Sequence, residues 1–139
     1  MRHVLAVVMA LVAVPALADP MGLEAVNALR DVKGVKPLSY SDRLEQAAEA
    51  HARDMAKHGY FSHSGRNGST VGKRVTAAGY RWCFVAENIA KGQRSLDAVM
   101  AGWTNSPGHY RNMVEARARE MGLARAEGDV WVMVLAAPC

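Results

Sequence analysis

The last apolar segment of the chain is the feature that most limits how it folds. From residue 130 to residue 137 every position is apolar, so a strand there has two apolar faces. The two faces carry Val130, Val132 and Val134 on one side and Trp131, Met133 and Leu135 on the other. A strand of this kind has to be covered on both faces. The chain also contains predicted helices that can cover each face of the sheet. The sequence therefore predicts an α+β fold with three layers, an α-β-α sandwich.

Two other segments are predicted strands. Residues 121–126 form a β-hairpin with the final strand through Glu127-Gly128-Asp129. Residues 82–90 are apolar on both alternations, and their only strongly polar side chains are those of Glu87 and Asn88. An ionised carboxylate inside such a strand is costly unless it is paired or hydrogen-bonded. That cost makes Glu87 a candidate functional residue.

Apolar residues at helical spacing predict two helices in the first half of the chain. The first runs from about residue 21 to residue 32 and ends at Gly34. In the second, Asp42 is the predicted N-cap with Glu45 three residues later, which is a capping-box pattern. Gly59 closes this second helix.

Three shorter helices are predicted further along the chain. The first covers about residues 70–78. Ser95 is the predicted N-cap of the next, and Ser106 with Pro107 fits the N-cap and first position of the last. His109 then lies in the first turn of that helix, where the helix dipole favours a neutral imidazole.

A histidine also lies on the apolar side of the second helix. His51 shares this side with Leu44, Ala48 and Met55, at spacings of three and four residues. A single histidine in such a place is more often a hydrogen-bonded structural residue than a ligand. We therefore expect His51 to have a structural role, with a ligand role as the alternative.

The start of the chain resembles an export signal. The 139 residues suit one compact domain. Arg2, an apolar run over residues 4–14 and the small-residue end Ala16-Leu17-Ala18 match a secretory signal peptide. The alternative, a membrane anchor, needs roughly 18 or more apolar residues. We expect a signal peptide over residues 1–18, a single domain over residues 19–139, and a secreted or periplasmic location.

Export bears on the two cysteines of the sequence, Cys83 and Cys139. In an exported protein an even pair of cysteines most often forms a disulfide. Two buried reduced thiols are the alternative. A disulfide between them closes a long loop that contains Glu87 and His109.

The charge of the chain does not favour nucleic acid as a partner. The net charge of +4 falls to +3 when Arg2 leaves with the signal, and the lysines and arginines are scattered rather than arranged in a stripe. We expect no nucleic-acid binding, and no membrane span after the signal is cleaved.

Three motifs in order resemble a known family. They read HARDMAKHGYFSHSG from residue 51, AENIA from residue 86 and VMAGWTNSPGHYRNM from residue 99. In this order and spacing they resemble the bacterial branch of the CAP superfamily of SCP-like extracellular proteins. That superfamily contains cysteine-rich secretory proteins, antigen 5 and pathogenesis-related 1 proteins. The resemblance covers residues 21–138 and implies a three-layer α-β-α sandwich.

The resemblance also implies a cleft with two histidines and two acidic residues. By their motifs, the matching residues are His63 in YFSH, Glu87 in AENIA and His109 in GHY. Many eukaryotic members carry the second acid three residues after the helix tryptophan, where this chain has Ser106. Glu120 resembles an acid of bacterial members and is the candidate substitute in the cleft.

The functions implied by the resemblance are mainly binding functions. They include the binding of sterols, fatty acids, divalent cations such as zinc, and extracellular or cell-surface proteins. Two neutral imidazoles are suitable ligands for Zn²⁺, so His63 and His109 are the candidate metal ligands, although no cofactor is required. We expect a non-catalytic binding module.

Two alternatives stay open. A metal-dependent hydrolase or protease would use the same cleft, because an open position on zinc activates water. The sequence has no HExxH motif and no GxSxG turn, and Ser62, Ser64 and Ser106 near the histidines carry no nucleophile signature. In the second alternative, Glu87 accepts hydrogen bonds from the two histidine loops and has only a structural role.

The signal-peptide pattern predicts that exported protein begins at Asp19. Signal peptides are cleaved after a small residue, and Ala18 is the last residue of the Ala-Leu-Ala end. N-terminal sequencing of protein collected from the periplasm or the medium tests this. Exported protein that still begins with Met1 would contradict it.

Overall fold

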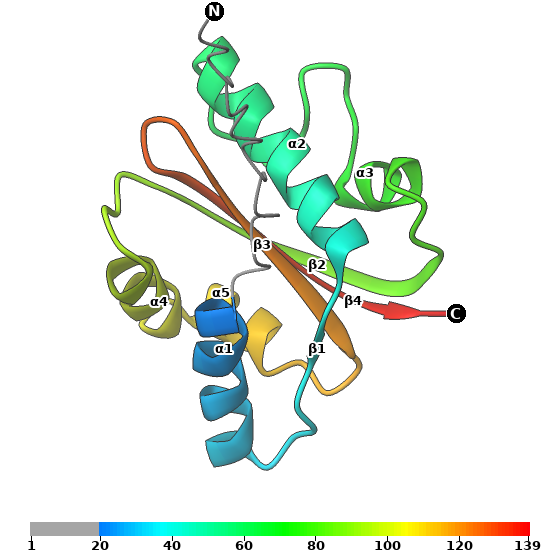
Figure 1. Cartoon of the computed structure of the whole chain (residues 1–139), viewed down its shortest axis with the longest axis vertical. Coiled ribbons are helices and arrows are strands. Elements are labelled where there is room, and N and C mark those ends of the chain that lie inside the picture. Colours follow the sequence, from blue (N-terminus) through cyan, green and yellow to red (C-terminus); the bar gives the residue numbers. More distant parts are fainter. Residues whose placement is uncertain (1–19) are drawn as a thin grey trace, which may run out of the picture.

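The computed structural model describes residues 20–139, and the predicted signal peptide lies outside the described residues. Helices and strands are interspersed along the chain (Figure 1). In order they are α1 (Pro20–Lys33), β1 (Ser39–Tyr40), α2 (Asp42–His58), α3 (Val71–Ala77), β2 (Trp82–Lys91), α4 (Leu96–Thr104), α5 (Pro107–Met113), β3 (Glu120–Ala126) and β4 (Val130–Pro138). Among residues 20–139, no helix is long and apolar enough to cross a membrane.

The strands form one mixed sheet in the order β1-β3-β4-β2. The predicted hairpin is β3 and β4, and β2 pairs antiparallel with the other side of β4. The short strand β1 pairs parallel with β3, and its two residues were too few to be predicted from periodicity. The strand β2, which carries Glu87, is therefore at an edge of the sheet.

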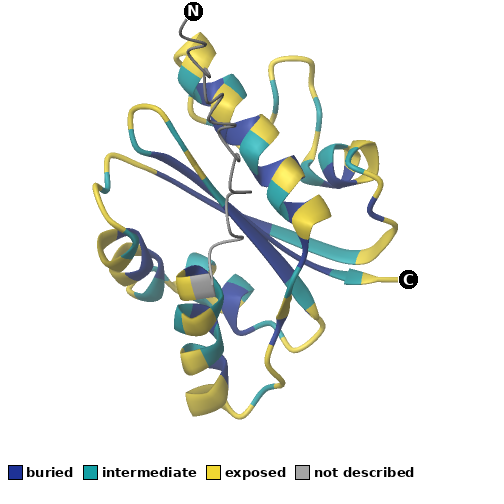
Figure 2. Ribbon diagram, viewed as in Figure 1, coloured by how far each residue is buried: buried dark blue, intermediate teal, exposed yellow. Residues whose placement is uncertain are grey.

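Strand β4 lies between two apolar cores, as its two apolar faces predict. Val130, Val132 and Val134 pack in one core with residues of α2 and α3. Trp131, Met133 and Leu135 pack in the other core with residues of α1, α4 and α5. Figure 2 shows the buried strands in dark blue with exposed residues on the outer sides of the helices. The predicted three-layer α-β-α sandwich is confirmed.

Helix α2 lies against β3 at a glycine. A Cβ atom at Gly122 would lie 2.1 Å from the backbone nitrogen of Glu45, so only glycine permits this approach. The N-cap of α2 is Ser41, whose Oγ accepts a hydrogen bond from the backbone N–H of Leu44. The prediction of Asp42 as N-cap is therefore wrong by one residue. Ser41 still has extended backbone angles after β1, and the helix begins only at Asp42.

The two cysteines form a disulfide, as predicted, and the reduced alternative is excluded. Cys83 near the start of β2 is bonded to Cys139, 56 residues later, just after β4. On the chain-entropy model, a loop of this size stabilises the fold by roughly 3–4.7 kcal/mol. The disulfide thus fixes the end of the chain to the strand that carries Glu87.

A buried arginine connects α1 to the segment after α5. Arg30 is fully buried, and its guanidinium donates hydrogen bonds to four backbone carbonyls. The acceptors are the carbonyls of Lys36, Met113, Glu115 and Ala118. These bonds give donors to carbonyls at the helix ends and in the following turn, and the carbonyl of Glu115 also accepts from the backbone N–H of Ala118.

Arg30→Met is expected to lower the free energy of unfolding by on the order of 3 kcal/mol, because several buried carbonyls lose their donor. The matched control is Arg53→Met on the exposed side of α2, where the arginine side chain is 74% exposed and pairs with Glu49. The control should change stability by less than about 0.5 kcal/mol. Urea unfolding of both variants tests this, and equal effects would contradict the role of Arg30.

Candidate functional site

The edge of β2 that does not pair with β4 is covered by side chains from α4 and α5. The backbone N–H of Gly92 bonds to the carbonyl of Asp129, so residues 88, 90 and 92 exchange hydrogen bonds with β4. Residues 87, 89 and 91 then direct their backbone groups away from β4. The carbonyl of Glu87 accepts from Asn112 Nδ2, and that of Ile89 accepts from Trp103 Nε1. These bonds hold both helices against the edge of the sheet.

The Glu87 carboxylate is buried and has two charged or polar partners. Its side chain is only 2% exposed. Glu87 Oε2 lies 2.8 Å from Arg74 Nη2, and Oε1 lies 2.8 Å from His63 Nδ1. Arg74 also donates to the carbonyls of His63 and Ser69, which fixes the loop that carries His63. The buried charge is therefore compensated by an arginine that is itself 11% exposed.

Arg74 is a site residue that the sequence analysis missed. It lies in α3, directly before the strand that carries Glu87. A signal for it was present, since a carboxylate in an apolar strand requires a cation or several donors nearby. What the sequence lacked was the direction of α3 relative to β2, which alone decides whether Arg74 or another of the basic residues reaches the carboxylate.

His63 presents one ring nitrogen to Glu87 and the other to solvent. Its side chain is 60% exposed, although its partner is buried. Because a carboxylate accepts hydrogen bonds, Nδ1 carries the proton, and in the neutral ring Nε2 keeps its lone pair. A carboxylate behind a histidine in this way orients the ring and makes its free nitrogen a better metal ligand.

His51 of α2 forms a hydrogen bond with the backbone of the loop that carries His63. It is 2% exposed, and its Nε2 lies 2.8 Å from the carbonyl of Ser62, the residue before His63. Burial, and secondarily the charge of Arg74, lowers the pKa of His51, so the neutral ring donates to the carbonyl. This is the structural role that the apolar position of His51 predicts.

His109 is held by Ser106. His109 Nδ1 lies 2.8 Å from Ser106 Oγ. Ser106 is at the N-cap position of α5, as predicted, but its side chain makes no capping hydrogen bond. The interpretation of this hydroxyl as a cap is therefore wrong, because the hydroxyl bonds to the imidazole of His109 instead.

His109 and His63 come from opposite layers of the sandwich and lie close to each other at the edge of β2. Burial lowers the pKa of His109, and the nearby His63 lowers it further. The carbonyl of His109 accepts a hydrogen bond from Asn88, the neighbour of Glu87. The structure thus places His63 in contact with Glu87, with His109 beside His63.

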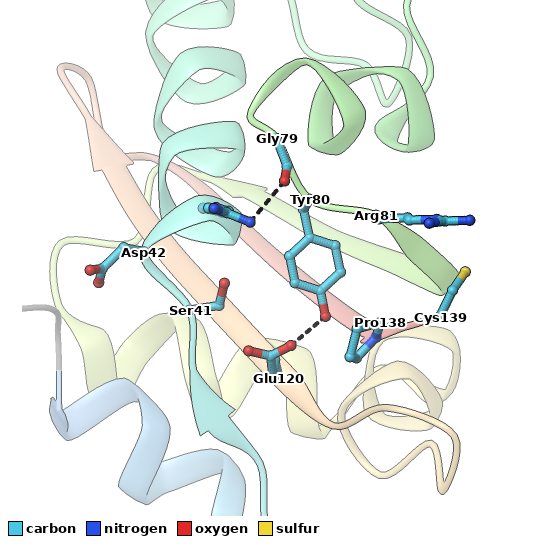
Figure 3. Close-up of a pocket in the computed structure, with 9 residues that line it drawn as sticks. Ser41, Asp42, Gly79, Tyr80, Arg81, Glu120, Pro138 and Cys139 are labelled. Carbon is cyan, nitrogen blue, oxygen red and sulfur yellow. Dashed lines mark hydrogen bonds between the residues drawn. The ribbon is translucent and has the colours of Figure 1, made fainter.

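Glu120 lies in a different pocket (Figure 3). Its Oε2 accepts a hydrogen bond of 2.6 Å from the Tyr80 hydroxyl, in a pocket of about 480 Å³ at the end of the chain. Burial, and then the bond to Glu120, raises the pKa of Tyr80. Glu120 is the first residue of β3, and β4 lies between β3 and β2 in the sheet. The structure therefore does not bring Glu120 to the histidines.

An apolar groove of about 320 Å³ is lined by residues of β2 and α4 and by His109. Phe61, from the loop of His63, is one wall. The other lining residues come from β2, the turn after it, α4 and the start of α5: Ile89, Ala90, Lys91, Gln93, Val99, Gly102, Trp103, Ser106 and His109. His109 therefore lines a groove large enough for a small ligand.

Known proteins are similar to this chain in sequence. The Bacillus subtilis protein YkwD is 32% identical over 110 residues, which are 78% of this chain and 43% of YkwD. The membrane protein YlbC of the same organism is 26% identical over 101 residues, 73% of this chain and 29% of YlbC. The chain thus spans less than half the length of these curated relatives.

Among solved structures, an extracellular SCP-domain protein from Bacillus anthracis superposes with a TM-score of 0.81 at 23% identity. This match covers 84% of this chain and 39% of that protein. An outer surface protein from Borrelia burgdorferi, 21% identical, gives a TM-score of 0.80, and the match covers 86% of this chain and 92% of that protein. Both share the fold described above.

The sequence profile of the cysteine-rich secretory protein family, CAP, matches residues 23–135. This range contains all three motifs, the whole of the candidate site and most of the sandwich. The chain belongs to the cysteine-rich secretory protein family.

Proposed function

We propose that this protein is an exported, non-catalytic binding module that holds a divalent cation of the zinc type between His63 and His109. The observation that carries the proposal is the contact of His63 Nδ1 with the buried Glu87 carboxylate, 2.8 Å long, which leaves Nε2 as the nitrogen for a ligand. His109 has the same arrangement, with Nδ1 on Ser106 Oγ. Each ring is thus held by one nitrogen, with the other available.

The donor set fits a cation that is only partly enclosed by protein. Imidazole nitrogens suit zinc. Glu87 is not a third ligand in this proposal, since its two oxygens already bond to Arg74 and His63. No group of three or more His, Cys, Asp or Glu residues within residues 20–139 is arranged to hold a metal. Two protein ligands leave the other positions of the cation open to water or to a donor from a bound partner.

The bonding of Glu87 also argues for binding over hydrolysis. A metal-dependent hydrolase of the HExxH type uses a carboxylate as general base. In this protein, the carboxylate nearest the histidines is Glu87, and both of its oxygens are already bonded, one to Arg74 and one to His63. The next candidate, Glu120, is bonded to Tyr80 in another pocket. Hydrolysis at the same cleft is therefore the second choice.

An extracytoplasmic location is part of the proposal. The signal-peptide pattern of residues 1–18 and the Cys83–Cys139 disulfide both support export, because disulfides persist in oxidising compartments. The names of the B. anthracis and B. burgdorferi proteins describe extracellular and outer-surface proteins. Lipids, sterols and surface proteins are the ligand classes that the family suggests for such a module.

Zinc titration of the mature protein tests the cation site. We expect binding at pH 7.5 that is lost in His63→Ala and in His109→Ala, because each variant removes half of the protein ligands. The matched control is His58→Ala, which removes a histidine of α2 that pairs with Asp54. Isothermal calorimetry measures all three. Absence of zinc binding in the wild type, or unchanged binding in the double histidine variant, would contradict the proposal.

Zinc affinity is expected to fall with pH below about 6.5, the ordinary imidazole pKa, because protonated imidazole cannot bind the metal. The pKa of His109 is lowered, so this ring stays neutral to a lower pH than a free imidazole and delays the loss. Calorimetric titrations from about pH 8 to about pH 5 span the histidine range and measure the profile. Affinity that stays constant over this whole range would exclude histidine ligands.

A double-mutant cycle separates the binding role of Glu87 from its structural role. Arg74→Met and Glu87→Leu should each lower stability by about 3 kcal/mol, because each leaves a buried charge unpaired. The double variant should recover part of this loss. It should nevertheless bind zinc about 10–100-fold more weakly, since His63 loses the carboxylate that orients it. Unchanged zinc affinity in a folded double variant would show that Glu87 is only structural.

A further inference from the structure

A tryptophan is held at the protein surface where β2 begins. Trp82 is 38% exposed, although its indole N–H is fully used inside the protein. Nε1 lies 3.1 Å from both the carbonyl oxygen of Gly72 and Oγ1 of Thr76. A Cβ atom at Gly72 would lie 2.5 Å from Trp82 Cζ2, so the indole packs against α3 only because residue 72 is glycine. The orientation of the ring is therefore fixed, while part of its surface stays open to solvent.

Trp82 lines a pocket that adjoins the pocket of Glu120. The first has a volume of about 350 Å³, and it shares Gly79, Tyr80 and Arg81 with the second (Figure 3). Both pockets lie on the side of the sheet that α2 and α3 cover. Trp82 bonds to α3, Tyr80 packs in the core with α2 and α3, and Glu120 bonds to Tyr80. The two pockets thus belong to one surface at the end of the sheet.

The charged side chains of this surface balance each other. Arg43 and Arg81 line the larger pocket together with Asp42 and Glu120. Arg81 lines both pockets, is exposed, and in the part of the chain that the structure describes its guanidinium forms no hydrogen bond or ion pair. Glu120 accepts from Tyr80 through Oε2, and a carboxylate has further acceptor sites. Free donors and acceptors with balanced charges suit a neutral ligand that carries hydroxyl groups, since each hydroxyl both donates and accepts.

The indole beside these polar groups narrows the class of ligand to a saccharide. A sugar ring presents a face of C–H groups to the negative face of an aromatic ring and keeps its hydroxyls for hydrogen bonds at its edge. A cationic ligand would be repelled by Arg43 and Arg81, and an anionic one by Asp42 and Glu120. An acyl chain would cover these charged groups without pairing them, which is costly.

The register of the sheet sets the length of the saccharide. Trp82 is opposite Pro138 of β4, and Glu120 is opposite Ala136 of the same strand. Because β4 lies between them, Trp82 and Glu120 are separated by two strand spacings, about 10 Å. One sugar ring is too short to contact both side chains, whereas two linked rings can reach from the indole to the carboxylate.

We propose that this surface binds a neutral glycan through at least two linked sugar rings. One ring packs on the exposed part of the Trp82 indole. Hydroxyls of the two rings accept hydrogen bonds from the Arg81 guanidinium and donate to the Glu120 carboxylate. The proposal does not use the cation at His63 and His109, so the two sites are tested separately.

The test uses the mature, disulfide-bonded protein with EDTA present and three neutral disaccharides as probes: cellobiose, maltose and N,N′-diacetylchitobiose. Binding is followed by the NMR shifts of the Trp82 indole N–H, with the buried Trp103 indole N–H as internal reference. At least one disaccharide should shift the Trp82 signal and leave the Trp103 signal unchanged. The corresponding monosaccharide should bind roughly tenfold more weakly, since it cannot contact both ends of the surface.

Variants of the surface separate binding from folding. Arg81→Ala should weaken disaccharide binding roughly tenfold without lowering the melting temperature, because the guanidinium has no partner among residues 20–139. The matched control is Arg53→Ala on the exposed side of α2, which should bind like the wild type. Trp82→Leu should abolish binding. Trp82→Phe loses the two indole hydrogen bonds but keeps an aromatic face, so it should retain binding.

The remaining outcomes decide between this ligand and others. Choline or phosphate that shifts the Trp82 signal more strongly than every disaccharide overturns the saccharide, as does the absence of binding by all three probes. Disaccharide binding that survives both Trp82→Leu and Arg81→Ala overturns the assigned surface. Disaccharide binding without zinc binding supports this surface and contradicts only the cation site. Zinc binding without disaccharide binding contradicts only the surface.

Discussion

The buried ion pair of Arg74 and Glu87 is the interaction on which the candidate site depends. A carboxylate on an apolar strand is stable only with a partner, and Arg74 of α3 provides one at 2.8 Å. The same guanidinium bonds to the backbone of the loop that contains His63. The orientation of His63 therefore depends on the packing of α3 against β2, and α3 itself packs in the core of α2 and β4 through Val75.

The second half of the site depends on β2 being an edge strand. Its outward carbonyls at Glu87 and Ile89 are taken by Asn112 and Trp103, which seat α4 and α5 beside the sheet. This brings His109 from one layer to His63 from the other. An interior strand would have a neighbour at this place, and the two imidazoles would be separated by the sheet. The candidate site thus lies at the edge of the sheet, where helices rather than a further strand bond to the backbone of β2.

Much of the fold followed from local pattern. The two apolar faces of β4, the glycine ends of α1 and α2, and the Ser95 and Thr70 starts of α4 and α3 all depend on neighbouring residues, and the structure has them close to where the sequence placed them. The N-cap of α2 was missed by one residue, because whether Ser41 or Asp42 is still extended depends on pairing with β3. Strand β1 was missed because its two residues are too few for a periodic pattern.

By itself the sequence determined the residue types of the site, the layers of the sandwich and the cysteine pair, because each depends on periodicity, composition or a motif in register. Only the tertiary structure decided which partner each polar side chain has. Glu87 pairs with Arg74, Ser106 bonds to His109 rather than capping α5, and Glu120 pairs with Tyr80 away from the histidines. These choices depend on the relative placement of helices and strands, since a polar group in a folded chain bonds to what packing brings within about 3 Å.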